Sequence, residues 1–176
     1  MLLSIEPYSG VGEVKFGMNK KEVKRIAGTP ELSCSIEKMT NETRNDVGFQ
    51  YDSGKLACIT VDSHALIRNT VKINEEQFGY GLLENLQLLN RLTTRQVKVR
   101  NLGMYIYPEL GVVFFKRKTL DYYLAKPQIS HNYVLAICSD AILKEFYNYS
   151  LEKEPEEETF DSTMFDTIET ILQKKK

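Results

Sequence analysis

The chain has no tryptophan, only two histidines and only three cysteines among its 176 residues. His64 and His131 cannot by themselves complete a zinc site, which takes three or four protein ligands, and we expect both at the surface ends of strands. Cys34, Cys58 and Cys138 form no C-x-x-C pair, so neither a zinc knuckle nor a redox dithiol is indicated. We therefore expect free, mostly buried thiols and no metal or other cofactor.

Long hydrophobic runs are also absent. No segment reaches the roughly 18 uncharged apolar residues that a membrane-spanning helix needs. The opening MLLSIEPYSG has no basic region, and Glu6 and Pro7 interrupt its apolar residues, so it does not resemble a signal peptide. The contents of 42% hydrophobic and 27% charged residues are usual for a globular domain. The sequence therefore predicts a soluble cytoplasmic protein without membrane contact.

Motifs for catalysis are missing as well. The glycines of GVGEVKFG do not have the G-x-G-x-x-G spacing of a dinucleotide site, and no Walker lysine follows them. No G-x-S-x-G, H-E-x-x-H or calcium-loop pattern occurs. We therefore predict a non-enzymatic protein. An enzyme whose site is assembled from scattered Asp, Glu and Tyr side chains stays an open alternative.

Charge is unevenly distributed although the net charge is only −1. The segment 152–169 holds eight acidic residues and one lysine, a net charge of −7, while 170–176 adds three lysines. The remaining residues, 1–151, therefore carry +3. Because the body is weakly basic, the acidic segment can fold against it or shield it.

The stretch EVKFGMNKKEVKRIAGTP predicts a short strand followed by a short helix. Asn19 and Glu22 have the spacing of a capping box. Gly28 fits the left-handed position that follows a helix, and Pro30 prevents its continuation. The helix is therefore expected over residues 20–27.

Later segments repeat this order of elements. The polar stretch 33–46 has weak periodicity, but VGFQYDSGKLACITVD predicts a hairpin over 47–61. LLENLQLLNRL then predicts a second helix, VKVRNLGMYIYPELGVVFFKRK predicts three strands with a turn, and QISHNYVLAIC and DAILKEFYNY predict a closing strand and a helix. We predict an α+β protein of two tandem helix-plus-antiparallel-meander units, 1–73 and 74–150, then an acidic linker, 151–160, and an amphipathic C-terminal helix, 161–176, that docks on the body or forms a homodimer.

The stretch GVGEVKFGMNKKEVKRIAGTP resembles the signature of the SmpA/OmlA (BamE-like) domain family. In that family a glycine-methionine pair leads into a helix, a glycine-x-proline ends it, and a three- or four-stranded antiparallel meander follows. Two such units in tandem are similar to the secreted beta-lactamase inhibitory proteins. The resemblance implies a scaffold that binds other proteins and has no catalytic residue. It extends over 10–61 and covers 78–118 poorly; the matching residues are Gly17, Met18, Glu22, Val23, Gly28 and Pro30, and Asn19 replaces the usual serine or threonine.

Neither localisation of these relatives carries over to this chain, since the lipoprotein signal of the outer-membrane members and the signal and disulfides of a secreted inhibitor are not found in its sequence.

Aromatic side chains indicate where a partner would bind. Eight of the ten tyrosines follow residue 79. Tyr105 and Tyr107 share one face of a predicted strand because side chains alternate. Tyrosine offers a large contact area at small entropy cost, and protein interfaces favour it. The alternative, that these rings only cover the edge of the core, stays open. We predict a partner-binding surface made of Tyr105, Tyr107, Phe115, Tyr122 and Tyr123.

The favoured function is a non-enzymatic cytoplasmic protein-binding module, in its most concrete form an immunity or inhibitor protein that blocks a cognate enzyme or toxin through its sheet. The alternative is a nucleic-acid-binding protein whose acidic tail is autoinhibitory. Lys116, Arg117 and Lys118 beside Phe114 and Phe115 would offer phosphate contacts and stacking rings. However, the acidic segment would compete for that patch, so we favour a solvated strand end and do not expect nucleic acid as a partner.

Overall fold

The protein is described by a computed structural model that covers residues 2–79, 81–99, 103–116, 133–151 and 156–159. Strands and helices both occur, so the predicted α+β class is confirmed. The elements are β1 (Leu2–Glu6), β2 (Gly10–Val11), β3 (Val14–Lys15), α1 (Lys20–Ala27), β4 (Leu32–Ile36), β5 (Met39–Arg44), β6 (Val47–Asp52), β7 (Lys55–Asp62), α2 (Ser63–Arg68), β8 (Thr70–Ile73), β9 (Glu76–Gln77), α3 (Leu82–Arg91), β10 (Arg95–Val99), β11 (Met104–Tyr107), β12 (Val112–Lys116), β13 (Tyr133–Cys138), α5 (Asp140–Leu151) and β14 (Glu156–Thr159).

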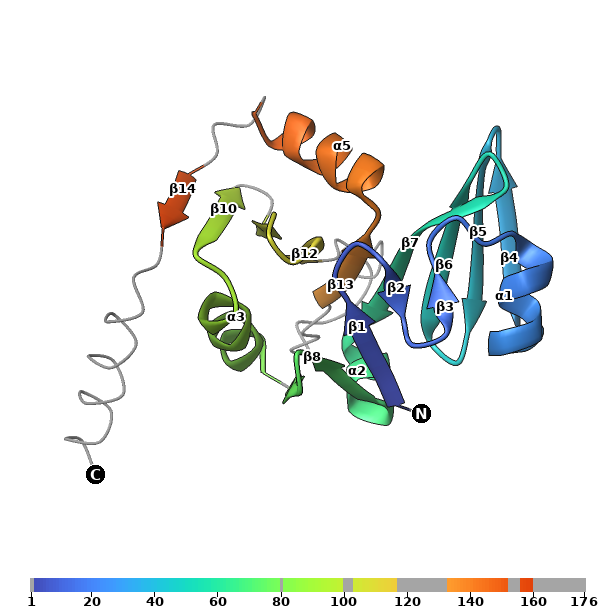
Figure 1. The fold of residues 1–176 in the computed structure, drawn as a ribbon, viewed down its shortest axis with the longest axis horizontal. Coiled ribbons are helices and arrows are strands. Elements are labelled where there is room, and N and C mark those ends of the chain that lie inside the picture. Colours follow the sequence, from blue (N-terminus) through green and yellow to red (C-terminus); the bar gives the residue numbers. More distant parts are fainter. Residues whose placement is uncertain (1, 80, 100–102, 117–132, 152–155, 160–176) are drawn as a thin grey trace, which may run out of the picture.

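Nine strands form one antiparallel sheet in the order β14-β10-β11-β12-β13-β7-β6-β5-β4 (Figure 1). α1 precedes the meander β4 to β7, and α3 precedes the meander β10 to β13. The two meanders join where β7 pairs with β13, so that Ile59 lies opposite Ile137. The order of one helix and four antiparallel strands therefore occurs twice along the chain.

The first helix has the predicted bounds. The Asn19 side chain accepts hydrogen bonds from the backbone N–H groups of Lys21 and Glu22, at 2.9 and 3.1 Å. The Glu22 carboxylate accepts from the Asn19 backbone N–H at 2.7 Å, which completes the capping box. Gly28 has φ 84° and ψ −175°. Its φ is positive as predicted, but its ψ is extended rather than left-handed helical, a combination that essentially only glycine adopts.

The hairpin predicted over 47–61 is confirmed as β6 and β7, with Ser53 and Gly54 in the turn at φ 49° and 79°. A second hairpin, β4 and β5, lies in the polar stretch that received no assignment from the sequence. All five residues of β4 are exposed. Its five residues alternate between apolar and polar, but the run is short and the apolar face is not buried, so the strand signal is weak.

The nine-stranded sheet packs against other elements on both faces. One face carries the larger core, to which Tyr51, Ile59 and Leu135 belong, and which also includes residues of α1, α2, α3 and a five-stranded sheet. That second sheet has the order β3-β2-β1-β8-β9, with β1 and β8 parallel. On the opposite face a smaller core includes Ile106 and Val113 of the sheet and residues of α5, which contacts β7, β12 and β13.

Two predicted boundaries can be placed in this architecture. The boundary between residues 73 and 74 falls at the turn between β8 and β9, which pair with each other. Part of the predicted linker 151–160 is a strand, since β14 pairs with β10 at the edge of the large sheet. The predicted helix 161–176 lies outside the described residues. Within the described residues, no helix is both long and apolar enough to cross a membrane.

Candidate functional site

Tyr107 is a core residue. None of its side chain is exposed, and its hydroxyl accepts a hydrogen bond from Gln96 Nε2 at 2.6 Å and donates one to Asn90 Oδ1 at 3.0 Å. The prediction that Tyr107 contacts a partner is therefore withdrawn. Alternation placed it correctly on the same strand face as Tyr105, but that face is covered where α3 supplies Asn90.

The other predicted aromatic residues do not form one surface. Tyr105 is half-buried on the face of the larger core, with Lys98 Nζ 5.8 Å from the centre of its ring. Phe115 lies on the opposite face, where its ring centre is 6.2 Å from that of Phe146 on α5. Tyr122 and Tyr123 lie outside the described residues. The structure thus separates Tyr105 from Phe115 by the thickness of the sheet.

The face that carries Phe115 continues across β13 onto the first four-stranded half. Cross-strand pairs connect Phe115 to Val134 and Val134 to Asp62. Beyond β7 the side chains of this face are exposed or half-buried. We call this part the open face; its residues are Leu32, Cys34 and Ile36 on β4, Met39, Asn41 and Thr43 on β5, Gly48 and Gln50 on β6, and Thr60 and Asp62 on β7.

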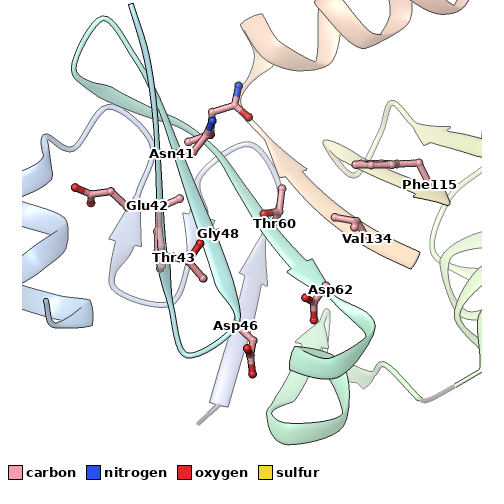
Figure 2. Close-up of a pocket in the computed structure, with 11 residues that line it drawn as sticks. Asn41, Glu42, Thr43, Asp46, Gly48, Thr60, Asp62, Phe115 and Val134 are labelled. Atoms are coloured by element: carbon pink, nitrogen blue, oxygen red, sulfur yellow. The ribbon is translucent and has the colours of Figure 1, made fainter. Parts of the chain in front are cut away.

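A hollow of about 410 Å³ lies on the open face and extends to β13 and β12 (Figure 2). Gly48 forms part of its floor. A Cβ atom on Gly48 would lie 2.2 Å from Thr60 Oγ1, so glycine lets the threonine side chain lie across the neighbouring strand. The lining residues are Asn41, Glu42, Thr43, Asp46, Gly48, Phe49, Gln50, Thr60, Asp62, Phe115 and Val134.

The hollow is acidic and polar. Its lining residues include no lysine or arginine, and Asp46 and Asp62 give the hollow its acidic character, because the carboxylate of Glu42 points to the other side of β5. Asp46 forms an ion pair with Arg68 at 2.5 Å, and Asp62 Oδ1 accepts the backbone N–H of Ala65 at 2.8 Å, which caps α2. Carboxylate and amide groups on an open surface suit basic or amide groups of a partner, whereas phosphate groups would be repelled.

A buried ion pair lies on the side of β5 opposite the open face. Glu42 points to the other side of β5, where its Oε2 lies 2.6 Å from Arg44 Nη2; the two side chains are 8% and 2% exposed. Arg44 Nε donates to the Gly28 carbonyl at 2.8 Å, and the guanidinium lies 5.0 Å from the centre of the Phe49 ring. These contacts join the end of α1 to β5, so the open face has a rigid base.

Tyr51 lies beside this ion pair and is also fully buried. Among the described residues, neither its hydroxyl nor Arg44 Nη1 has a hydrogen-bond partner. Burial and the nearby Glu42 carboxylate raise the pKa of Tyr51 to about 12. The phenol is therefore a neutral core group at physiological pH and not a general base.

The cysteines show no sign of catalysis. Cys58 and Cys138 are buried as expected, and their sulfur atoms are 3.8 Å apart across the joint of β7 and β13. The contact with the Cys58 thiol, together with burial, raises the pKa of Cys138, which opposes formation of a reactive thiolate. Cys34 is exposed, contrary to the general expectation of burial.

The histidines and acidic residues do not form a metal site in the described part of the chain. His64 lies in the first turn of α2, directly after β7, and His131 falls outside the described residues. The described residues contain no group of three or more His, Cys, Asp or Glu side chains that could hold a metal ion.

Sequence reasoning found Phe115, which lines the hollow, but missed the residues of the open face. The alternation in Val47-Gly48-Phe49-Gln50-Tyr51 indicates that Gly48 and Gln50 lie on the less buried side of their strand. This alternation is visible in the sequence alone. The hollow itself also depends on a pair of strands far apart in the sequence, β7 and β13, where Asp62 lies opposite Val134, and periodicity alone does not reveal that pairing.

Comparisons with protein-family models, with curated proteins and with solved structures find no match for this chain.

Proposed function

We propose that this chain is a non-enzymatic protein-binding module that takes its partner on the open face. The observation that carries the proposal is a hollowed sheet face that no described helix covers, in one half of a sheet whose other half is covered by α5 on the same side. A rigid surface loses little conformational entropy when it binds, which favours association.

The composition of the open face supports a protein as the partner. Leu32 and Ile36 are 71% and 69% exposed at the rim on β4, next to the polar lining of the hollow. Apolar side chains beside polar ones over a wide, shallow surface are typical of protein interfaces. Sites for small molecules are more enclosed and mainly apolar.

The charge of the hollow narrows the chemistry of the partner. Asp46 and Asp62 favour a lysine or arginine side chain that enters the hollow, and Asn41 and Gln50 offer amide groups beside it. An immunity or inhibitor protein that blocks a cognate enzyme or toxin is the most concrete form of the proposal. The doubled order of one helix and four antiparallel strands in one sheet supports the resemblance to tandem BamE-like units, from which that form derives.

The alternative, a nucleic-acid-binding protein, has weaker support. The acidic lining of the hollow opposes phosphate contacts at this surface. The basic patch on which the alternative depends continues beyond Lys116 into residues outside the described ranges. Binding of nucleic acid would weaken steeply with salt and strengthen when 152–176 is deleted.

The test is affinity capture from a lysate of the native host, followed by mass spectrometry, with two matched variants. Asn41→Arg places a cation beside the hollow, whereas Asn148→Arg makes the same change on the exposed side of α5. We expect one stoichiometric protein that is retained by wild type and by Asn148→Arg and is lost by Asn41→Arg. Equal retention by both variants, or recovery of nuclease-sensitive nucleic acid instead, would contradict the proposal.

A further inference from the structure

The strand β4 forms one edge of the nine-stranded sheet (Figure 1). Within the described residues it pairs only with β5, and its whole length is exposed. An edge strand presents unpaired backbone N–H and C=O groups, which are a template for another strand. Proteins commonly protect such edges with charged residues or proline, but the sequence of β4, LSCSI, contains neither.

The turn after β5 determines which backbone groups of β5 face β6. Asn45 and Asp46 form a two-residue turn in which both have positive φ, 49° and 64°. In such a hairpin the flanking residues, here Arg44 and Val47, exchange their backbone hydrogen bonds. Because the direction of these groups alternates along a strand, Arg44, Glu42 and Thr40 bond to β6, and the residues between them bond to β4.

The same alternation determines which groups of β4 are free. Asn41 lies opposite Cys34, so these two residues form a hydrogen-bonded pair. The first residue of β5 and Ile36 flank a two-residue turn, so they also form a hydrogen-bonded pair, in agreement with this alternation. Ser33 and Ser35 therefore direct their backbone N–H and C=O groups outward, away from the sheet.

The sequence of β4 is almost the same in both directions. Leu32-Ser33-Cys34-Ser35-Ile36 has serine on both sides of Cys34 and an aliphatic residue at each end. A two-fold axis through Cys34 would place Ser33 opposite Ser35 of a second copy, which are the residues whose backbone groups are free. An interface with two-fold symmetry needs such self-complementarity, because the same surface serves both subunits.

We propose that β4 pairs antiparallel with β4 of a second copy of this chain, with Cys34 opposite Cys34. Pairing buries Leu32 of one copy beside Ile36 of the other, and both side chains are among the most exposed large apolar groups of the described chain. The two nine-stranded sheets then become continuous, and the two open faces lie next to each other. The proposal depends on the backbone edge of β4 and not on the hollow, although Leu32 and Ile36 also belong to the rim of the open face.

The opposite edge of the sheet is less suited to self-pairing. The sequence of β14, EEET, has three consecutive glutamates, and two copies of it would place like charges close together. At β4, like charges occur only outside the strand, where Glu31 would lie opposite Glu37 of the second copy. Salt screens such charges, so we expect the dimer to strengthen as the salt concentration rises.

Cys34 allows the pairing to be trapped chemically. In the proposed arrangement the two Cys34 residues form a non-hydrogen-bonded pair, whose Cα atoms are about 4.5 Å apart. This distance lies within the range of about 4.4 to 6.8 Å that a disulfide spans. Diamide, a thiol oxidant, takes up two electrons and two protons from the two thiols as the S–S bond forms. We expect a covalent dimer on a non-reducing gel for wild type and none for Cys34→Ser.

The decisive test is sedimentation velocity of the full chain over a range of concentrations. Ser33→Pro removes an outward N–H group in each copy without touching the bonds to β5, and Ser33→Ala is its matched control. We expect wild type and Ser33→Ala to form a dimer, and Ser33→Pro to dimerise at least about tenfold more weakly, because two symmetric donors are lost. Leu32→Lys, at an exposed position, serves the same purpose if the proline variant fails to fold.

Three results would overturn the proposal. One is a wild-type protein that stays monomeric at all concentrations. A second is a dimer that Ser33→Pro and Leu32→Lys both leave unchanged, which would place the interface elsewhere. The third is a diamide-treated wild type that gives no covalent dimer although sedimentation shows a noncovalent one.

Discussion

At the scale of single residues, two buried tyrosines differ in the surroundings of their hydroxyl groups. The hydroxyl of buried Tyr107 bonds to Gln96 and Asn90, whereas the hydroxyl of buried Tyr51 has no partner among the described residues. The same chemical group therefore stabilises the fold at one position and is tolerated at the other. The sequence alone does not distinguish these two cases, because the partners of Tyr107 come from α3 and β10.

Substitution of Tyr107 by phenylalanine should destabilise the protein. Tyr107→Phe removes two hydrogen bonds, while Gln96 Nε2 still donates to Asn90 Oδ1 at 3.0 Å, so the free energy of unfolding should fall by about 1–3 kcal/mol. Urea denaturation followed by circular dichroism measures this change. Tyr105→Phe, at a half-buried position on the same strand, is the matched control, and an equal loss for both variants would show that the hydrogen bonds of Tyr107 contribute nothing special.

Tyr51 predicts a specific loss of stability in alkali. Its pKa is about 12 in the folded state and 10.0 as the ordinary value. Above pH 10 the unfolded chain loses a proton that the folded protein keeps, so the free energy of unfolding should fall as the pH rises from 10 towards 12. Burial also raises the pKa of Tyr8 and Tyr133. The contribution of Tyr51 to the pH dependence is therefore measured as the difference in the free energy of unfolding between wild type and Tyr51→Phe.

The measurement is urea denaturation of both proteins below pH 10 and near pH 12. We expect Tyr51→Phe to match or exceed the stability of wild type below pH 10, since the hydroxyl it removes has no hydrogen-bond partner in the described part of the chain. Near pH 12 the free energy of unfolding of Tyr51→Phe should exceed that of wild type by a larger amount. A difference that does not change with pH would contradict the raised pKa.

At the scale of elements, local signals predicted some segments and failed for others. The capping box of α1 and the alternation of β6 are formed by neighbouring residues, so the sequence reveals them directly. β4 alternates apolar and polar residues over only five positions and buries neither face, and β14 lies within a run of acidic residues, so the signal of both strands is weak. β11 is buried almost entirely because the sheet is covered on both sides, a property that depends on distant helices.

The cap of α1 should contribute measurably to stability. Asn19→Ala removes the acceptor for two N–H groups at the start of the helix and should lower the free energy of unfolding by about 1 kcal/mol. Lys21→Ala, on the exposed side of the same helix, should have a much smaller effect. Thermal unfolding followed by circular dichroism compares the two variants. Equal effects would show that the capping box does not contribute.

At the scale of the whole molecule, the pairing of β7 with β13 makes one sheet of two four-stranded halves. The larger core includes Ile59 and Val61 from the first half and Leu135 and Ile137 from the second. Such a shared core should make the halves unfold together. The α+β class was predicted from the sequence, whereas the pairing of β7 with β13 was not.

A substitution at this joint tests that cooperativity. Leu135→Ala in the buried part of β13 should cost about 2–5 kcal/mol. Native-state hydrogen exchange should show amides of β6 and of β11 losing protection by the same free energy, because both report one global unfolding event. Loss confined to β11 and its neighbours would mean that the halves unfold separately.

The most direct test of the proposed binding surface is hydrogen exchange of the protein alone and in complex with the protein partner captured from the host lysate. If the open face binds the partner, peptides from β4, β5 and β6 should gain protection, and peptides from α5, which covers the same side of the sheet in the other half, should not. Protection confined to α5, or to α1 behind the sheet, would contradict the central proposal that this chain binds its partner on the open face.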